Sequence, residues 1–374
     1  QPLTTKTMKF TKTITHIISN ISVAAILAAS AVLVAAQTPG NAPTTPPPGT
    51  TVLLTTSGSP QAQLQQVVEE DLALPDLTLP DDPTLPDIPF NAEVEFTDVN
   101  LAQAVRKALG KNEGDGPVRV YDLSSPSFTE LWLNDLGIQN LTGLEHARFL
   151  QKLGINDNNV SDLSPIARLT SLRELWASNN QIENLTPLEN LTGLVNLGLS
   201  TNKIDDLTAL KDLTNLSWLD LGNFHFQRSN TFTDLTPLAG LTKLTGIYLC
   251  ETQVSDLSPL KGMTNLQGLH IAHTNVRDLS VVENFPHLKN MTMRGGEITD
   301  YTPLASRSAL KEIKFYGGTL DLATVPVVPS VERITLGWMT VVNIEALKNW
   351  PNLTVVKIIN VKFDPPPVGV PPID

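Results

Sequence analysis

The sequence predicts an α/β solenoid: a curved, right-handed coil with a parallel β-sheet on its concave face, 3₁₀ or irregular segments on its convex face, and a helical N-terminal cap. Three features predict this fold. A 22-residue pattern recurs along the chain, and Leu172–Gly193 is its clearest copy. Each copy opens on an alternating apolar motif, L-x-x-L-x-L. The best copies place Asn at the ninth position and Pro at the sixteenth.

Eleven copies of this pattern align over residues 128–363. Their first residues are Phe128, Leu150, Leu172, Leu194, Leu216, Leu244, Leu266, Leu288, Leu310, Val331 and Leu353. Most steps between copies are 22 residues long, but the step from Leu216 to Leu244 is longer by six and contains the insertion Phe224–Ser229. A pattern kept in register over this length indicates one repeat array and not several separate globular domains.

Each part of the repeat has a predicted conformation. Apolar residues at the fourth and sixth positions alternate with outward-facing residues, which is typical of a short strand. Asn at the ninth position ends the strand, because its amide can hydrogen-bond the backbone of a turn. Pro at the sixteenth position suits the start of a 3₁₀ segment and not a strand. A single repeat buries too little apolar surface to fold alone, so the repeats must stack.

Two segments precede the cap. Residues 1–36 resemble a secretory signal segment that starts at Met8, because basic residues, an apolar run and a small-residue cleavage site at Ala35-Ala36 follow in that order. An uncleaved membrane anchor is the alternative interpretation. Residues 37–92 are rich in Pro, Thr and Asp, and we expect an acidic, disordered stalk there.

Residues 93–127 should form the N-terminal cap. Asp98 or Thr97 can cap a helix that runs from about Val99 to Leu109. Such a helix would shield the apolar end of the first repeat from water.

The array changes towards its C-terminal end. Thr and then Gly replace the Asn of the ninth position, and the last three repeats lose the Thr-Pro-Leu segment. These repeats are either divergent capping coils or a region that frays. Residues 364–374 form a Pro-rich tail.

The repeat is identified as a leucine-rich repeat. Its 22-residue form with D-L-[ST]-P-L, as in Asp162–Ile166 and Asp256–Leu260, resembles the repeat of bacterial internalins. The segment FTDVNLAQAVRKALG resembles the internalin N-terminal cap, so the resemblance covers about residues 94–363. It implies the solenoid fold and says little about the ligand. Because we recognise no immunoglobulin-like domain after the repeats, the host-cell adhesion known for that family is not carried over.

Composition excludes several classes of function. The net charge is -12, and no Lys or Arg occurs between Lys12 and Arg106. From Arg106 onward the chain holds 23 basic and 28 acidic residues, which does not resemble a nucleic-acid-binding face. The single cysteine, Cys250, excludes an intramolecular disulfide framework. No catalytic motif is present, so we expect neither an enzyme nor a cofactor.

The candidate binding site lies on the concave face, where the third, fifth and seventh positions should point outward. Trp132 and Trp176 occupy fifth positions two repeats apart, so a strand spacing of roughly 4.8 Å places them about 10 Å from each other. This spacing favours an aromatic binding strip in which glycines leave slots between the rings. The alternative is a set of ordinary exposed aromatic residues. The candidate ligand-binding residues are Trp132, Trp176, Trp218, Tyr248, His270, Asp220, Arg294, Lys314 and Tyr316.

Two further features lie near this strip in the repeat pattern. In the insertion, Phe224, His225 and Phe226 either extend the strip or cover the edge of the core. His270 and His273 fall near Cys250 of the preceding repeat, but no fourth ligand follows from the spacing, so we predict no metal site.

The sequence therefore predicts a secreted or cell-surface protein whose concave face recognises a protein or glycan partner without catalysis. We expect a monomer that binds no nucleic acid and meets a membrane only if its N-terminal segment is not cleaved. One alternative is a structural envelope or scaffold protein without a selected ligand site. A further alternative is an intracellular regulatory subunit.

Overall fold

The computed structural model describes residues 89–223 and 229–364, which all belong to one compact unit, Leu74–Asp374. The predicted signal segment, most of the predicted stalk, the insertion residues 224–228 and the tail from residue 365 onward lie outside the described residues.

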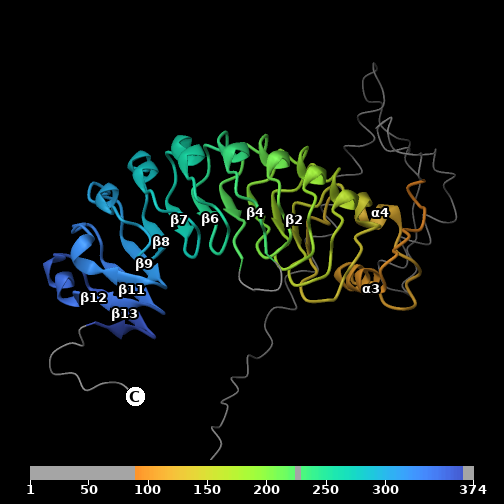
Figure 1. The fold of residues 1–374 in the computed structure, drawn as a ribbon. Coiled ribbons are helices and arrows are strands. Elements are labelled where there is room, and N and C mark those ends of the chain that lie inside the picture. The colour runs from red at the N-terminus through yellow and green to blue at the C-terminus, as the bar shows by residue number, and fades with distance from the viewer. Residues whose placement is uncertain (1–88, 224–228, 365–374) are drawn as a thin grey trace, which may run out of the picture. The chain divides into compact units, whose positions relative to one another are not determined.

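One parallel sheet runs through the repeats, and its strands follow one another in chain order (Figure 1). Its eleven strands are β1 (Glu130–Trp132), β2 (Lys152–Gly154), β3 (Glu174–Trp176), β4 (Asn196–Gly198), β5 (Trp218–Asp220), β6 (Gly246–Tyr248), β7 (Gly268–Ile271), β8 (Asn290–Arg294), β9 (Glu312–Tyr316), β11 (Arg333–Gly337) and β13 (Val355–Ile359). Each strand begins at the third position of a predicted repeat, so the predicted register is confirmed. The sheet lines the concave side of the array.

The core lies between the sheet and the convex side, as the alternating pattern predicts. Leu153, Leu175 and Leu197, at the fourth position of consecutive repeats, are each 0% exposed. They are also direct partners in the strand pairing, so each leucine packs above the equivalent leucine of the next repeat. Burial of these side chains between neighbouring repeats supplies the stability that one repeat lacks.

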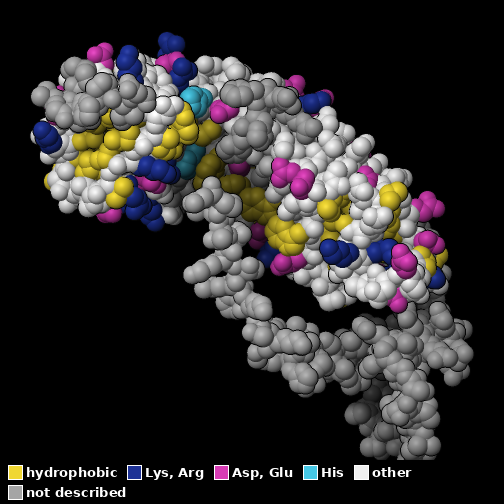
Figure 2. Space-filling model, turned by 90° about the horizontal axis from the view of Figure 1, so that it is seen from below, with side chains coloured by type: hydrophobic (Ala, Val, Ile, Leu, Met, Phe, Trp, Pro, Cys, Tyr) yellow, Lys and Arg dark blue, Asp and Glu magenta, His cyan; other side chains and the backbone are white. Residues whose placement is uncertain are grey.

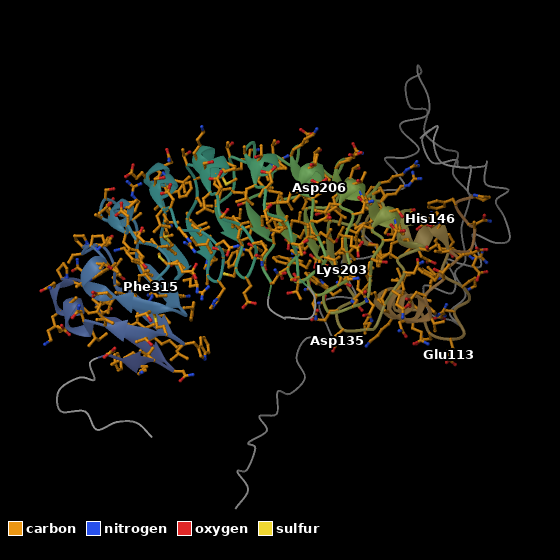
Figure 3. The ribbon with its side chains drawn as sticks, in the orientation of Figure 1. Glu113, Asp135, His146, Lys203, Asp206 and Phe315 are labelled. Atoms are coloured by element: carbon orange, nitrogen blue, oxygen red, sulfur yellow. The ribbon has the colours of Figure 1, made fainter. Side chains whose placement is uncertain are left out.

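Short 3₁₀ helices form the convex side, where the Thr-Pro-Leu segments predict them. They span Leu144–His146, Ser164–Ile166, Thr186–Leu188, Thr208–Leu210, Thr236–Leu238, Ser258–Gly262, Ser280–Asn284, Thr302–Leu304, Leu322–Thr324 and Ile344–Asn349. An acidic or Asn side chain accepts a hydrogen bond at the start of most of them. Asp206, labelled on this side in Figure 3, accepts from the backbone N–H of Thr208 at 2.8 Å.

Buried asparagines tie consecutive repeats together. The Asn180 side chain donates from Nδ2 to the carbonyl oxygens of Ile155 in the preceding repeat, at 2.8 Å, and of Ala177 in its own, at 3.2 Å. Its Oδ1 accepts from the backbone N–H of Val160, also in the preceding repeat, at 3.0 Å. Asn158, Asn202 and Asn230 make equivalent contacts. The predicted role of the ninth position is therefore confirmed.

The last repeats replace this side-chain ladder with backbone pairing. The hydroxyl of Thr252 donates only within its own repeat, to the carbonyl of Leu249 at 2.7 Å. From β8 onward the strands of the main sheet lengthen to five residues. A second parallel sheet joins β10 (Thr319–Asp321), β12 (Thr340–Val342) and β14 (Lys362–Phe363). These hydrogen bonds favour divergent coils over a frayed end.

The helix predicted after Asp98 is present as α3 (Val99–Ala108). One carboxylate oxygen of Asp98 accepts from the backbone N–H groups of Asn100 and Leu101, and the other accepts from Gln139 and Asn140 of the first repeat. A second, short helix, α4 (Val120–Leu123), was not predicted. Within the described ranges no helix is long and apolar enough to cross a membrane.

Replacing Asn180 by Ala should destabilise the array strongly. The change leaves the buried N–H of Val160 without its acceptor, Asn180 Oδ1, which costs about 1–3 kcal/mol. It also removes one of the two amide donors from each of two buried carbonyls, which keep the other donor. We expect the free energy of unfolding, measured by urea denaturation, to fall by roughly 3 kcal/mol. Asn184→Ala is the matched control, because Asn184 is exposed and accepts only a local bond from Thr186 N–H at 2.9 Å. Equal losses in the two variants would contradict the ladder.

Candidate functional site

An apolar band crosses the concave face of the repeat array. Figure 2 views the molecule from this side and shows hydrophobic side chains as a band over the strands. His side chains lie beside the band towards the C-terminal part of the array. The outward-facing positions of the strands build this surface. The predicted ligand-binding residues of the described strands therefore belong to this surface.

Four of the predicted residues form one continuous set of rings, Trp176, Trp218, Tyr248 and His270, which we call the aromatic tract. The Trp176 and Trp218 ring centroids lie 5.0 Å apart, and those of Trp218 and Tyr248 lie 5.1 Å apart. Tyr248 and His270 stack at 4.0 Å with an interplanar angle of 5°. The tract runs from β3 to β7 and its members are all half-buried. Such ring pairs contribute roughly 0.5–1.5 kcal/mol each beyond their burial.

Four aromatic residues face a glycine directly across the strand pairing, in the pairs Trp132–Gly154, Trp176–Gly198, Trp218–Gly246 and Tyr316–Gly337. The glycines do not leave open slots, so that part of the prediction is wrong. A Cβ on Gly198 would lie 2.9 Å from Cε3 of Trp176, and one on Gly246 would lie 3.0 Å from Cδ1 of Trp218. Each ring leans over the glycine of the next repeat, because only a residue without a side chain lets it approach the backbone.

His270 is held in a defined state. Its Nδ1 and the hydroxyl of Thr292 are 2.9 Å apart. Burial, together with the positive charge of Lys314, lowers the pKa of His270 to about 4. The imidazole is therefore neutral at physiological pH, and the tract carries no positive charge at this end.

Asp220 was predicted to project outward, but its side chain is only 8% exposed. Burial raises the pKa of Asp220 to about 6, although hydrogen bonds from the Gly222 N–H, at 3.0 Å, and from Ser200 favour the charged form. The strand register places Asp220 next to Tyr248. The carboxyl group of Asp220 is thus buried next to the tract and is not accessible to a ligand.

Trp132 stands apart from the tract, with 51% of its surface exposed. From β1 to β3, the third positions of the repeats carry a row of charged side chains. Lys152 Nζ lies 2.8 Å from Glu130 and 4.0 Å from Glu174. Glu174 also accepts from Nε1 of Trp176 at 3.3 Å, which connects this row to the first ring of the tract.

The remaining predicted residues lie in the C-terminal half of the face. Arg294 pairs with Glu297 at 2.9 Å, and Lys314 with Glu312 at 3.3 Å. The ring of Tyr316 lies 5.8 Å from that of Trp338. Trp338, which is not among the predicted residues, is 59% exposed and has a positive φ of 48°. Trp338 directly follows a strand, at a repeat position that does not require an apolar residue. A tryptophan at such a position could have indicated an exposed binding residue.

Two predictions remain, one about the insertion and one about a metal site. Phe224, His225 and Phe226 lie outside the described residues. Among the residues that the structure does describe, no group of three His, Cys, Asp or Glu side chains is arranged to hold a metal ion. Burial, with the nearby charges of Asp220 and Glu251, raises the pKa of Cys250 to about 11, so this thiol is a poor nucleophile.

Gly198→Ala should move the Trp176 ring without removing it. The added Cβ would meet Cε3 at 2.9 Å, so the ring must tilt away from β4. We expect a changed near-UV circular dichroism spectrum and tryptophan emission, with a stability loss of about 1 kcal/mol because the half-exposed ring can yield. In the control Gly240→Ala the nearest atom to the new Cβ is 3.7 Å away, and neither spectrum should change. Unchanged spectra in both variants would refute the contact.

Asp220 should make the stability depend on pH. Because its pKa of about 6 lies above the ordinary value of 3.8, the folded state binds more protons than the unfolded state between these values. Its stabilising contribution is thus present below about pH 4 and lost as the pH rises through about 6. Asp220→Asn should raise the free energy of unfolding at pH 7 by at most about 3 kcal/mol and change it little at pH 4.

Urea unfolding of both proteins from pH 4 to pH 7 measures this difference. The control is Asp206→Asn, since hydrogen bonds from Thr208 hold the pKa of the exposed Asp206 below its usual range. That variant should gain no stability at pH 7. A difference between wild type and Asp220→Asn that stays constant over the pH range would contradict the assignment.

Comparison with known proteins agrees with this architecture. A family model described as leucine rich repeats in two copies matches residues 148–190 and 170–212. No curated protein matches the sequence. The solved structure of an internalin, inlF of Listeria monocytogenes, is similar with a TM-score of 0.56 and 25% identity, over 72% of this chain and 84% of that one. Internalin C2 of the same organism is 28% identical over 70% of this chain and 94% of its own, with a TM-score of 0.46. The repeat, the sheet, the leucine-rich-repeat model and the similarity to inlF together show a leucine-rich-repeat protein that is similar to bacterial internalins.

Proposed function

We propose that the concave face binds a protein partner and that the aromatic tract is its anchor. The observation that supports this proposal most is the contact of four half-buried rings across five consecutive strands. The rings are held by one another and by the glycines beneath them, so they lose little conformational freedom when a partner binds. Rigid aromatic side chains of this kind are enriched among the residues that contribute most to protein–protein binding.

Three features favour a protein over a glycan. Four strand-to-strand steps of roughly 4.8 Å make the five strands that carry the tract about 19 Å wide, which suits a macromolecular surface. A sugar ring would stack on a free aromatic face, whereas Tyr248 and His270 each use one face on the other. Charged residues of both signs border the tract, as at the rim of a protein interface.

We further propose that the protein acts outside the cytoplasm and without catalysis. The signal-like pattern of residues 1–36 supports this location, and the lack of a catalytic motif supports the absence of an enzymatic role. Recovery of the expressed protein in the cytoplasmic fraction alone would favour the intracellular regulatory subunit instead.

Replacing Trp176 and Trp218 together by Ala should abolish partner binding. Loss of one such anchor costs at least about 2 kcal/mol, or roughly 30-fold in affinity. The full chain, immobilised, is exposed to extracts and culture medium of the source organism and its surroundings, and retained proteins are quantified by mass spectrometry. We expect at least one protein to be retained by the wild type and lost with the double variant.

Phe149→Ala is the matched control, because Phe149 is 44% exposed and lies outside the strands of the concave face. It should retain the same proteins as the wild type. Thermal unfolding of all three proteins separates loss of binding from loss of fold. If the double variant folds and retains the same proteins as the wild type, the structural scaffold becomes the better interpretation.

A further inference from the structure

The charges on the concave face are unevenly distributed along the array. Beside the start of the tract, two glutamates share one lysine, Lys152. In the C-terminal half, the outward positions of β8, β9, β11 and β13 carry four cations and one carboxylate. The cations are Arg294, Lys314, Arg333 and Lys357, and the carboxylate is Glu312. Figure 2 shows Lys and Arg side chains beside the hydrophobic band at this end.

Three of these cations, Lys314, Arg333 and Lys357, form what we call the basic cluster. Glu312 is shared between two of them: its oxygens lie 3.3 Å from Lys314 Nζ and 3.7 Å from Arg333 Nε. Glu332 also lies near Arg333, but it pairs with Lys311 at 2.7 Å. Lys357 is exposed and makes no ion pair with any residue of the described ranges. Surface pairs of this kind contribute about 0–1 kcal/mol, so they do not prevent the cluster from meeting another anion.

The basic cluster continues the aromatic tract. The strand register joins the fifth positions into one row, Tyr248, His270, Thr292, Lys314, Thr335 and Lys357. At a strand spacing of roughly 4.8 Å, Lys314 lies about 10 Å and Lys357 about 19 Å beyond His270 along this row. The positive charge of Lys314 already contributes to the lowered pKa of His270, as expected for groups this close.

We propose that the partner presents an acidic protein segment next to its apolar contact, with the acidic residues over the basic cluster and the apolar ones over the aromatic tract. This inference rests on the proposed function and adds the chemistry and the direction of the bound segment. A uniform polyanion fits less well, because Glu130 and Glu174 would repel it at the other end of the tract. Complementary charge at this end would set the register of the partner on the face.

The test is selection of displayed random 12-residue peptides on the immobilised full chain. Such a peptide spans at most about 40 Å when extended, which is enough to reach from the tract to Lys357. We expect enriched peptides to combine aromatic or apolar residues with Asp or Glu. The variant Lys314→Glu/Arg333→Glu/Lys357→Glu should bind synthetic copies of them at least roughly tenfold more weakly. The neutral variant Lys314→Gln/Arg333→Gln/Lys357→Gln should have an affinity between that of the Glu variant and that of the wild type.

The control reverses three exposed lysines outside the strands of the concave face, in the variant Lys211→Glu/Lys243→Glu/Lys261→Glu. It carries the same change in net charge and should bind the peptides as the wild type does. Circular dichroism establishes that all variants are folded. Raising the NaCl concentration from 50 to 500 mM should weaken binding to the wild type and affect the basic-cluster variant less.

The outcomes separate the two proposals. Peptides that need Trp176 and Trp218 but show no acidic bias would overturn this inference and leave the proposed function standing. If no peptide binds the wild type more tightly than the Trp176→Ala/Trp218→Ala variant, the proposed function itself is contradicted. Binding of heparin through the basic cluster, more tightly than any selected peptide, would indicate an anionic polysaccharide and overturn the protein segment.

Discussion

In-register stacking of the repeats is the constraint on which the rest of the structure depends. A strand of three residues with one apolar face cannot form a core, so each repeat is stable only against its neighbours. Leucines meet equivalent leucines, and the buried amides of Asn158, Asn180 and Asn202 bond the backbone of two repeats at once. A slip of one position would expose the leucines and break both sets of contacts.

The same constraint creates the surface. Residues that share a repeat position become neighbours in the sheet, so side chains 22 residues apart lie one strand apart. The insertion does not interrupt this order, because Trp218 and Gly246 still pair across a step of 28 residues. Glycines at these positions let the rings settle onto the next strand. Ring contacts and charge rows across the concave face therefore follow from the repeat, although no repeat requires a tryptophan.

The parts of the fold that were predicted correctly depend on local patterns. Alternating leucines, the asparagine of the ninth position and the proline of the sixteenth each act within a few residues, so strand, turn and 3₁₀ segment could be located. The second sheet at the C-terminal end could not be located, because the positive φ of Gly318 permits the turn before β10 but does not specify which strands pair. The pairing itself arises between repeats. Trp338 was missed because it lies in such a turn, outside the repeat motif.

The sequence by itself determined the solenoid, the number and register of its repeats, and the residues that occupy the concave positions, since these follow from periodicity. Only the tertiary structure decided which of those residues act together. It brought Trp176, Trp218, Tyr248 and His270 into contact, left Trp132 apart, and buried Asp220 below the surface. The reason is physical: a repeat position sets the direction of a Cβ. The tilt of a ring, the solvation of a carboxylate and the pairing of a charge depend on atoms from neighbouring repeats.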